Sequence, residues 1–475
     1  MRRVLIANRG EIACRLLKAC RELGLETVAV YATPDADAPH VRLADFAREL
    51  PGTSPAETYL NAPALLARAQ GCGADALHPG YGFLSEDAAF ARACREAGLT
   101  FVGPPTEAIA RMGDKLEARA VAEAAAVPVL PGGTLEDGDA LPETYPVMIK
   151  AALGGGGMGL RRVAELKGLE AAIAEAQAQA AQAFGADRGR LYWETYAQGA
   201  RHIEVQIAGD AHGRVVALGE RECSVQRRYQ KLIEECPAPG LDAATRAELA
   251  ALAVSVAQSV GYQSVGTVEF LWTPELGPRF LEMNTRLQVE HAVTEQVWGL
   301  DLPQLQLRLA MGDSLEALLP PWGPRGHAIE ARLYAEDPQT GLPAPGRIDH
   351  LSWPMDPWLR VDAGTAAGVG VPPYYDALLA KLVAWGPDRA TAVRRLADAL
   401  SRVEIAGTLV TNLSRLRAVL AEPAFVAGEL HTHFLERELL IPELAPEAAA
   451  AAVACLPAAD GSVSQAAHWA ARRWR

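Results

Sequence analysis

The N-terminal part of the chain alternates between short apolar runs and longer amphipathic runs. Val4–Ala7 and Thr27–Tyr31 have the composition of strands, and the amphipathic run Glu11–Leu23 between them ends at Gly24, as helices commonly do. This order predicts a βαβ unit within an open parallel α/β domain that ends at about Thr106. Further strands are expected at Ala74–His78 and Thr100–Val102, and further helices at Ala62–Gln70 and Asp87–Ala97.

Two later regions mix strand and helix signals in a different order. Strand-like runs at Pro146–Lys150, Leu160–Val163 and Leu191–Tyr196, with the alanine-rich run Glu170–Phe184, predict a small α+β unit. Nearer the C-terminus, strand signals dominate residues 327–370. Helical patterns follow at 390–403 and 411–420, so a second α+β region is expected there.

The segment Glu282–Glu290 has a polar side chain at every second position. In an extended backbone alternate side chains share a face, so the polar groups should project together, while Met283, Leu287 and Val289 occupy the other face. An ordinary solvated strand face is the alternative, and it would explain any single carboxylate better than this mixed set. The polar set consists of Glu282, Asn284, Arg286, Gln288 and Glu290.

The run before this segment predicts a β-hairpin. Gly266–Trp272 and Arg279–Asn284 are strand-like and flank a turn-rich hexapeptide. If the turn is symmetric, Glu269 lies directly opposite Glu282. The same register pairs Trp272 with Arg279 and Phe270 with Leu281.

Two carboxylates that face each other across strands repel unless a cation lies between them. Carboxylate and amide oxygens are ligands that Mg²⁺ prefers, and Mg²⁺ usually shares its coordination shell with substrate phosphates. Glu269, Glu282 and Asn284 are therefore the candidate metal ligands.

A glycine run, Gly154–Gly157, lies between two strand-like runs, where its backbone amides could approach phosphates closely. A Walker loop is excluded because the Gly-Lys-Ser/Thr sequence is missing. Lys115, Lys150 and Lys231 could surround a triphosphate with compact positive charges. A flexible loop and isolated surface lysines are the alternative interpretation.

Composition narrows the class of protein. The 475 residues carry a formal net charge of −13, which argues against nucleic acid or an anionic membrane as the main partner. The seven cysteines form no Cys-x-x-Cys pair, so neither a zinc site nor a disulfide framework is expected, and a reducing cytoplasm suits them. The N-terminal apolar run is too short for a signal peptide or a membrane span.

Six motifs in order resemble those of biotin carboxylases, which belong to the ATP-grasp superfamily. The similarity covers roughly residues 2–438, and the motifs are highly specific together. They are Ile6–Ile12, His78–Glu86, Met112–Lys115, Arg201–Gln206, Gln226–Glu235 and Glu282–His291.

The resemblance implies an α/β and α+β fold. An N-terminal open parallel α/β domain (1–112, the pre-ATP-grasp domain) would precede a central ATP-grasp domain (113–326). The ATP-grasp domain would carry a hinged lid at about 129–206. A C-terminal α+β biotin carboxylase domain (327–440) and a tail (441–475) to which the resemblance assigns no role would follow.

The resemblance also implies the cofactors and their contacts. ATP would bind with Mg²⁺ or Mn²⁺, and the ions would be held by Glu269, Glu282 and Asn284. The nucleotide contacts would be Lys115, Lys150, Gly155, Gly156, Gly157, Glu194, Ala197, His202, Gln226 and Leu271.

By the same resemblance, ATP, bicarbonate and carrier-bound biotin would give carboxybiotin through carboxyphosphate. Glu290 would take the proton of bicarbonate, and Lys231 would lie on the phosphate-facing segment. Arg332 would stabilise the enolate-like anion of biotin, and Tyr81 would flank the ureido ring. Bicarbonate would be held by Arg286, Gln288, the Val289 backbone and Glu290, and the catalytic set would be Glu290, Arg286, Arg332 and Lys231.

The chain departs from the family's usual pattern without losing a residue assigned to metal, bicarbonate or biotin, so an active enzyme is predicted. The departures lie in the lid and beside the nucleotide: Leu153 and Met158 stand where the lid usually shows glycine and arginine, Thr195 and Ala197 replace a usual lysine and leucine, and Tyr229 replaces a common histidine.

No methionine-flanked lysine of the kind that carries biotin is present. The resemblance therefore implies a separate biotin carboxyl carrier protein and carboxyltransferase subunits, and by analogy a homodimer. Some C-terminal stretches are more like α-subunits of acyl-CoA carboxylases, but acetyl-, propionyl- and methylcrotonyl-CoA and pyruvate all stay open as final acceptors. Another ATP-grasp ligase, or a non-catalytic subunit, are the rival hypotheses.

Overall fold

A parallel five-stranded sheet forms the N-terminal part of the fold, as the sequence predicts. Its strand order is β3-β2-β1-β4-β5, and all neighbours are parallel. β1 (Arg3–Ile6), α1 (Gly10–Glu22) and β2 (Glu26–Ala32) make the predicted βαβ unit. The other elements up to residue 124 are η1 (Thr33–Asp35), α2 (Pro39–Leu43), β3 (Phe46–Leu50), α3 (Ala62–Gly71), β4 (Ala76–His78), α4 (Ala88–Glu96), β5 (Thr100–Phe101), α5 (Thr106–Gly113) and α6 (Lys115–Ala124).

The sequence pattern did not predict β3. This strand lies at the edge of the sheet, with Phe46, Arg48 and Glu49 exposed and only Leu50 buried. A strand that buries so little surface shows no clear alternation of apolar and polar residues.

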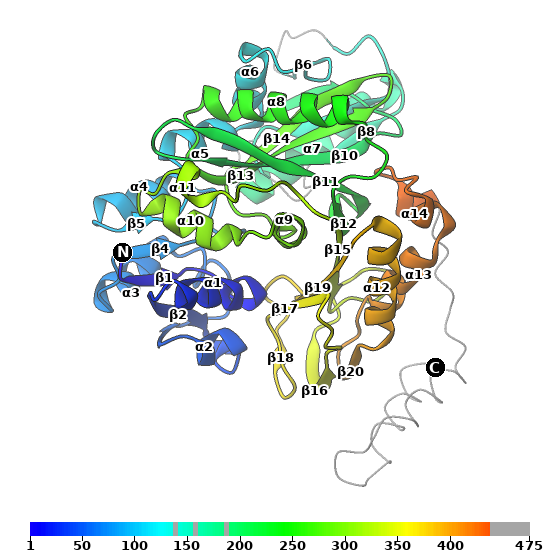
Figure 1. Cartoon of the computed structure of the whole chain (residues 1–475). Coiled ribbons are helices and arrows are strands. Elements are labelled where there is room, and N and C mark those ends of the chain that lie inside the picture. Colours follow the sequence, from blue (N-terminus) through cyan, green and yellow to red (C-terminus); the bar gives the residue numbers. More distant parts are fainter. Residues whose placement is uncertain (136–140, 155–159, 185–189, 438–475) are drawn as a thin grey trace. The chain divides into compact units, whose positions relative to one another are not determined.

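The computed structural model describes residues 1–135, 141–154, 160–184 and 190–437 (Figure 1). The expected tail 441–475 lies outside them. The small α+β unit is an antiparallel sheet of order β6-β9-β7-β8, covered by α7 (Leu169–Phe184). Its strands are β6 (Gly132–Thr134), β7 (Val147–Ala151), β8 (Arg161–Val163) and β9 (Leu191–Thr195), and η2 (Leu166–Gly168) precedes α7.

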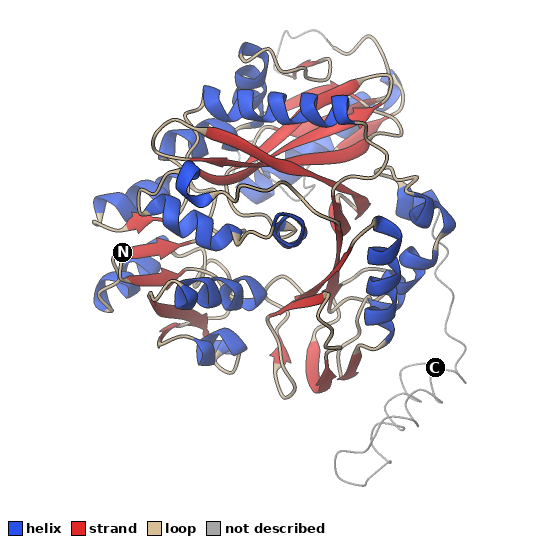
Figure 2. Cartoon of the chain, in the orientation of Figure 1, coloured by secondary structure: helices blue, strands red, loops and turns tan. Residues whose placement is uncertain are grey.

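An eight-stranded sheet of order β14-β13-β10-β11-β12-β15-β19-β17 runs through the rest of the fold (Figure 2). It crosses the boundary expected at residue 327, because β12 pairs with β15 over the register Ile233↔Ala331 to Cys236↔Ala328. Its strands are β10 (Arg201–Gly209), β11 (Val215–Arg227), β12 (Gln230–Cys236), β13 (Ser264–Thr273), β14 (Gly277–Asn284), β15 (His327–Tyr334), β17 (Leu359–Ala363) and β19 (Leu378–Gly386).

Helices bury the apolar faces of these sheets. α8 (Ala243–Ser259) packs Leu249 and Val256 against β10. α10 (Leu302–Ala310) joins the two large sheets, since it contacts both α1 and β13 and its leucines share a core with Leu16. α9 (His291–Trp298) packs against β11, β12 and β15, and the short α11 (Leu315–Leu318) follows α10.

The C-terminal region is built on β19. α12 (Arg389–Ser401) covers this strand, and α13 (Leu413–Ala421) packs on α12. No helix of the described residues is both long and apolar enough to cross a membrane. A three-stranded sheet of β16 (Gly346–Ser352), β18 (Gly370–Val371) and β20 (Glu404–Gly407), with α14 (Pro423–Ala427) and α15 (Phe434–Arg437), completes the region.

The predicted hairpin is present, but its register is only partly as expected. Glu269 does lie opposite Glu282. The expected pairs Trp272–Arg279 and Phe270–Leu281 are wrong, because a β-bulge after Glu269 shifts the strand by one residue. The observed pairs beyond the bulge are Phe270↔Phe280, Leu271↔Arg279 and Trp272↔Pro278.

Candidate active site

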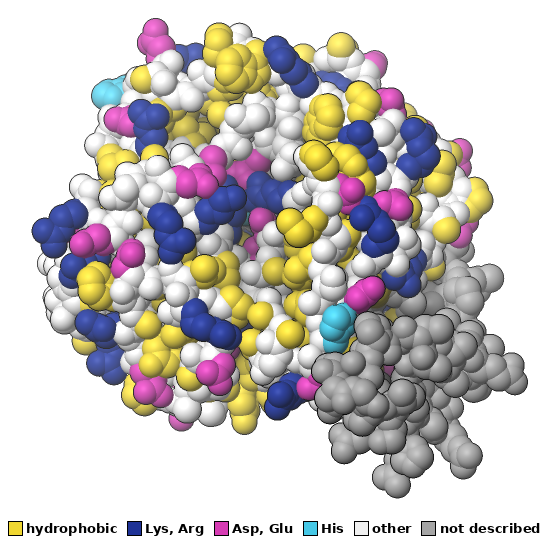
Figure 3. Space-filling model, turned by 60° about the horizontal axis from the view of Figure 1, so that its bottom comes forward, with side chains coloured by type: hydrophobic (Ala, Val, Ile, Leu, Met, Phe, Trp, Pro, Cys, Tyr) yellow, Lys and Arg dark blue, Asp and Glu magenta, His cyan; other side chains and the backbone are white. Residues whose placement is uncertain are grey.

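One cavity of about 640 Å³ is lined by loops and the start of α1 in the N-terminal part of the fold and by residues of the four-stranded and eight-stranded sheets. Figure 3 shows acidic and basic side chains gathered around a hollow on one face of the molecule. Gly155, Gly156 and Gly157 lie outside the described residues. Every other candidate from the sequence lines this cavity: Tyr81, Lys115, Lys150, Glu194, Ala197, His202, Gln226, Lys231, Glu269, Leu271, Glu282, Asn284, Arg286, Gln288, Val289, Glu290 and Arg332.

The polar residues of the alternating segment reach the cavity, although the strand itself is shorter than expected. β14 ends at Asn284, and the chain then turns toward α9. Met283 and Leu287 are buried in apolar cores, as predicted. Val289 was expected on the same apolar face, but it lines the cavity, because the extended backbone has ended before it.

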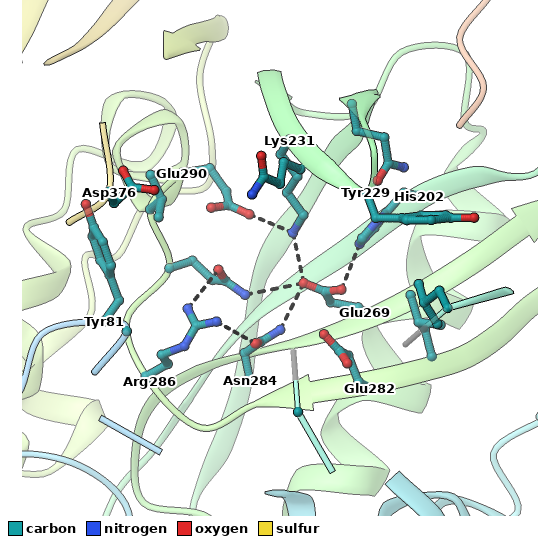
Figure 4. Close-up of a pocket in the computed structure, with 18 of the residues that line it drawn as sticks. Tyr81, His202, Tyr229, Lys231, Glu269, Glu282, Asn284, Arg286, Glu290 and Asp376 are labelled. Carbon is teal, nitrogen blue, oxygen red and sulfur yellow. Dashed lines mark hydrogen bonds and ion pairs between the residues drawn. The ribbon is translucent and has the colours of Figure 1, made fainter. Parts of the chain in front are cut away.

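Lys231 lies at the centre of three carboxylates. Its Nζ donates to Glu290 Oε1 at 2.7 Å and to Glu269 Oε1 at 2.8 Å (Figure 4). It also donates to Glu204. Burial alone would lower the pKa of Lys231, but these three carboxylates raise it well above its usual value. Lys231 is therefore a fixed positive charge within the cavity.

Glu269 connects the strands that carry the site. The Nε2 atom of His202 lies 2.9 Å from its Oε2, and Asn284 Nδ2 donates to its Oε1 at 2.9 Å. Glu204 on β10 lies directly opposite Glu269, and Glu269 lies opposite Glu282. Three carboxylates thus form a row across β10, β13 and β14.

Glu290 is fully buried at the N-terminus of α9. Its second oxygen accepts a hydrogen bond from Arg332 Nη2 at 2.9 Å. Burial would raise the pKa of Glu290, but Lys231, Arg332 and Arg221 outweigh it and hold that pKa well below the usual value. The carboxylate is therefore ionised at neutral pH and can accept a proton from a substrate.

Arg286 is oriented by three side chains. It donates from Nε to Glu86 Oε2 at 2.7 Å, from Nη2 to Asn284 Oδ1 at 2.8 Å and from Nη1 to Gln288 Oε1 at 3.1 Å. Its guanidinium therefore stands beside Glu290 in a fixed orientation, in a form suited to a small planar anion.

Two further lysines lie next to acidic partners. Lys115 Nζ donates to Glu282 Oε2 at 2.8 Å and to the carbonyl of Gly154 at 2.7 Å. Lys150 pairs with Glu194, which also accepts from Arg119 Nη1 at 3.0 Å. The three lysines thus enter one cavity from different elements, Lys115 from the start of α6, Lys150 from β7 and Lys231 from β12, where their charges can meet a polyphosphate.

Arg332 and Tyr81 mark another side of the cavity. Arg332 Nη2 lies 2.5 Å from Glu234 Oε1 as well as near Glu290. The Tyr81 hydroxyl donates to Glu11, which lies 3.3 Å from Lys381 Nζ. Arg332 is thus held by two buried carboxylates with its charge toward the cavity.

The donor chemistry fits a hard divalent cation. Glu269, Glu282 and Asn284 offer carboxylate and amide oxygens to one cavity, next to lysines that could carry phosphates. The structure adds a neighbouring set, since one ligand atom each of His202, Glu204 and Glu269 lie within 4.8 Å of one another. Glu269 belongs to both sets.

Several residues that shape the site had no role in the sequence analysis. Glu204 alternates with His202 and Gln206 along β10, a signal of the same kind as in Glu282–Glu290. Glu86 reaches Arg286 over 200 residues of sequence, which no local pattern reveals. Arg221 and Glu234 also belong to this set, and both are fully buried.

A buried carboxyl pair behind the cavity leads to a testable effect of pH on stability. Glu330 lies opposite Glu234, and both are fully buried. Burial, reinforced by Glu234 but opposed by Lys381, raises the pKa of Glu330 well above its usual value. Such a group destabilises the fold increasingly as pH rises above the unfolded value of about 4.3.

We therefore expect Glu330→Gln to raise the midpoint of thermal unfolding at pH 8 by about 2 °C, with a gain that shrinks toward pH 5. The neighbouring Glu235 is a matched control, for which the same substitution should change the unfolding midpoint in the opposite direction. Burial would raise its pKa, but His327 and Arg389 lower it. Glu235→Gln should lower the midpoint at pH 8. Calorimetry across this pH range checks both, and a lower midpoint for Glu330→Gln would contradict the expectation.

Family models match almost the entire described chain. "Biotin carboxylase, N-terminal domain" matches residues 1–109, "Carbamoyl-phosphate synthase L chain, ATP binding domain" matches 114–318, and "Biotin carboxylase C-terminal domain" matches 330–437. The chain thus matches biotin carboxylase models on both sides of a central ATP-binding domain model.

Individual proteins agree with these matches. The biotin carboxylase of Halalkalibacterium halodurans is 45% identical over 93% of this chain and 98% of its own. The mitochondrial methylcrotonoyl-CoA carboxylase subunit alpha of Oryza sativa subsp. japonica is 48% identical over 92% of this chain, but over only 60% of its own length.

A solved structure has the same fold. The biotin carboxylase domain dimer of Hydrogenobacter thermophilus 2-oxoglutarate carboxylase, in complex with MgADP, ADP and bicarbonate, superposes with a TM-score of 0.87. It is 42% identical and covers 92% of this chain and 97% of its own.

Proposed function

Because this chain belongs to the biotin carboxylase family and is an enzyme that carboxylates biotin at the expense of ATP, we propose that its three substrates meet in the cavity around Lys231 and Glu290. One observation carries the proposal. Glu290 is a buried, ionised carboxylate held 2.7 Å from Lys231 and 2.9 Å from Arg332. Deprotonation of bicarbonate requires a base that is ionised before the substrate binds, and the two cations keep Glu290 ionised.

Bicarbonate is proposed to bind between Arg286, Gln288, the Val289 backbone and Glu290. Arg286 is already oriented by hydrogen bonds, so its guanidinium can pair with the anion without further ordering. Glu290 takes the proton of bicarbonate, and the freed oxygen attacks the γ-phosphorus of ATP. The bond to ADP breaks, and carboxyphosphate forms.

The nucleotide is proposed to lie between the lid and the eight-stranded sheet. Lys115 and Lys150 would neutralise its phosphates, while Glu194, Ala197 and Leu271 would border its base. His202, Gln226 and Lys231 would face the phosphates from the other side. Phosphate contact is also proposed for Gly155, Gly156 and Gly157, because their residue numbers fall within the proposed lid at about 129–206.

Mg²⁺ is proposed at Glu269, Glu282 and Asn284, where it would neutralise phosphate charge as γ-phosphoryl transfer proceeds. This chain's residues contribute independently of the ion. Lys115 Nζ, 2.8 Å from Glu282, and Lys231 Nζ, 2.8 Å from Glu269, keep the two carboxylates in place.

Biotin is proposed to bind near Arg332 and Tyr81. When the ureido nitrogen loses its proton, negative charge develops on the ureido oxygen, and the Arg332 guanidinium can stabilise it. The dual contact of Arg332 with Glu234 and Glu290 supports this role, because it fixes the direction of the cation before substrate arrives.

The finer assignment is also a proposal. We propose that biotin is presented by a separate carrier protein and that the reaction is the first half of an acyl-CoA carboxylation with acetyl-, propionyl- or methylcrotonyl-CoA as acceptor. The likeness to a methylcrotonoyl-CoA carboxylase subunit supports this, while the 2-oxoglutarate carboxylase neighbour keeps other acceptors in view. We likewise propose carboxyltransferase subunits as partners, a homodimer, a cytoplasmic location, and domains at 1–112, 113–326 (lid about 129–206) and 327–440.

Phosphate release from MgATP tests the function. We expect release to depend on bicarbonate and to rise when free biotin is added. Release without bicarbonate would favour another ATP-grasp ligase. No release with bicarbonate, biotin and a biotinylated carrier protein would favour a non-catalytic subunit, and either result would overturn the proposal.

A further inference from the structure

Arg221 on β11 is the largest fully buried side chain of the described residues, and it does not line the cavity. All three guanidinium nitrogens have partners. Nε donates to Glu204 Oε1, Nη1 donates to Gln206 Oε1 at 2.7 Å and Thr294 Oγ1 at 2.9 Å, and Nη2 donates to Thr267 Oγ1 at 2.9 Å. A buried cation with every nitrogen bonded holds its neighbours in a fixed geometry.

The partners of Arg221 belong to the three elements that carry the carboxylates around Lys231. Glu204 itself lies directly opposite Arg221 on β10. Thr267 precedes Glu269 by two residues on β13, so both side chains share one face of that strand. Thr294 lies one helical turn beyond Glu290 on α9. One guanidinium thus connects β10, β13 and α9.

Glu204 transmits this geometry to the site. Its Oε1 accepts from Arg221, and its Oε2 accepts from Lys231. Lys231 reaches Glu269 and Glu290 from the same position, at 2.8 and 2.7 Å. If Glu204 moved, or if β13 and α9 shifted relative to it, one ammonium could no longer contact all three carboxylates.

We propose that Arg221 is a positioning residue, which sets the spacing of Glu204, Glu269 and Glu290 so that Lys231 bridges them. This inference rests on the proposed function, because it assigns Arg221 an effect on the step that Lys231 and Glu290 serve. Electrostatics support it in the same direction, since Arg221 is one of the cations that hold the pKa of Glu290 low. The residues that Arg221 positions would act on a small anion that lies next to a phosphoryl group.

The test removes hydrogen bonds rather than charge. Thr267→Val and Thr294→Val keep the shape of two buried side chains outside the cavity and delete their bonds to the guanidinium. Because the lost bonds would loosen the spacing of the carboxylates around Lys231, the double variant should lose about tenfold in kcat for bicarbonate-dependent ATP turnover, which is about 1.4 kcal/mol in activation free energy. The KM for ATP should stay near the wild-type value. Arg221→Lys keeps the positive charge but loses the several N–H donors of the guanidinium. It should likewise lower kcat and leave the KM for ATP near the wild-type value.

Thr106→Val is the matched control. Thr106 is also buried, and it accepts a hydrogen bond of 2.7 Å from Arg95, and neither residue lines the cavity. This variant should lose similar thermal stability and retain full kcat. An equal loss of kcat in Thr106→Val would show that the effect is a general one and would overturn the proposal.

A crystal structure of Thr267→Val/Thr294→Val provides a readout independent of turnover. We expect Lys231 Nζ to lose hydrogen-bond distance to at least one of its three carboxylates. Three retained contacts, or lost contacts with unchanged kcat, would overturn the role of Arg221. Absence of bicarbonate-dependent turnover in the wild type would instead overturn the proposed function, while the crystal structure would still decide whether Arg221 positions Lys231.

Discussion

Replacement of Glu290 by glutamine is expected to lower bicarbonate-dependent ATP turnover by about 10³-fold, the range typical of a lost general base. Glutamine has nearly the same shape and can still accept from Lys231 or Arg332, but it cannot take a proton. Lys231 keeps Glu204 and Glu269 as partners, and Arg332 keeps Glu234, so neither cation is left uncompensated. The fold and the binding of ATP should therefore persist.

Phosphate release measures the first effect, and calorimetric titration with MgATP measures the second. Glu330→Gln is a suitable control for activity, because Glu330 is equally buried but lies outside the cavity lining. It should turn over at the wild-type rate. Turnover of Glu290→Gln within tenfold of the wild type would remove Glu290 from its role as base.

Replacement of Lys231 by methionine should produce the other large effect, on activity and stability together. The change leaves Glu204, Glu269 and Glu290 as neighbouring buried carboxylates without their shared cation. Removal of one partner from a buried ionic cluster typically costs about 3–5 kcal/mol in free energy of unfolding. Turnover should fall below detection, since the ammonium proposed to face the phosphates is lost.

The stability loss should depend on pH in a defined direction. In the wild type the pKa values of Glu269 and Glu290 are lowered, despite burial, chiefly by Lys231, so both carboxylates stabilise the fold above their unfolded values. Without Lys231 burial prevails and raises these pKa values, so the loss should grow as pH rises from about 5 to 8. Urea denaturation of the nucleotide-free protein at several pH values measures it.

Two variants make this result interpretable. Glu204→Gln combined with Lys231→Met removes one of the three buried carboxylates that have lost their shared cation. The double variant should recover part of the stability at pH 8. Lys18→Met removes an exposed lysine whose side chain is 72% accessible, and it should change little. A Lys231→Met protein as stable as the wild type at pH 8 would contradict the charge balance derived for the cluster.

The sequence predicted the elements in which apolar and polar residues alternate with a clear period. It did not predict features that depend on contacts with other parts of the fold. The βαβ start and the 266–284 hairpin are strongly patterned, and both are present. β3 was not predicted, because it is an edge strand whose side chains remain mostly exposed. The bulge after Glu269 was not predictable from a symmetric turn, since it depends on how the two strands pack.

The candidate site could be assembled from the sequence only as far as local spacing extends. The alternation in Glu282–Glu290 brought five cavity-lining polar groups together correctly, even though the strand ends at Asn284. The partners that orient them come from far along the chain. Glu86 orients Arg286, and Arg332, itself held by Glu234, orients Glu290. Such contacts follow from strand order, which the local pattern does not contain.

The pairing of β12 with β15 has a consequence for engineering and for gene fusion. A chimera that joined residues 1–326 to the C-terminal region of another carboxylase would have to rebuild four cross-strand pairs with a foreign strand. The same exchange would replace Arg332 on β15, together with the neighbouring strand β19, while Glu234 on β12 and Glu290 stayed those of the original chain. Recombination breakpoints at this position should therefore yield soluble, active hybrids only when both parents share the β15 sequence.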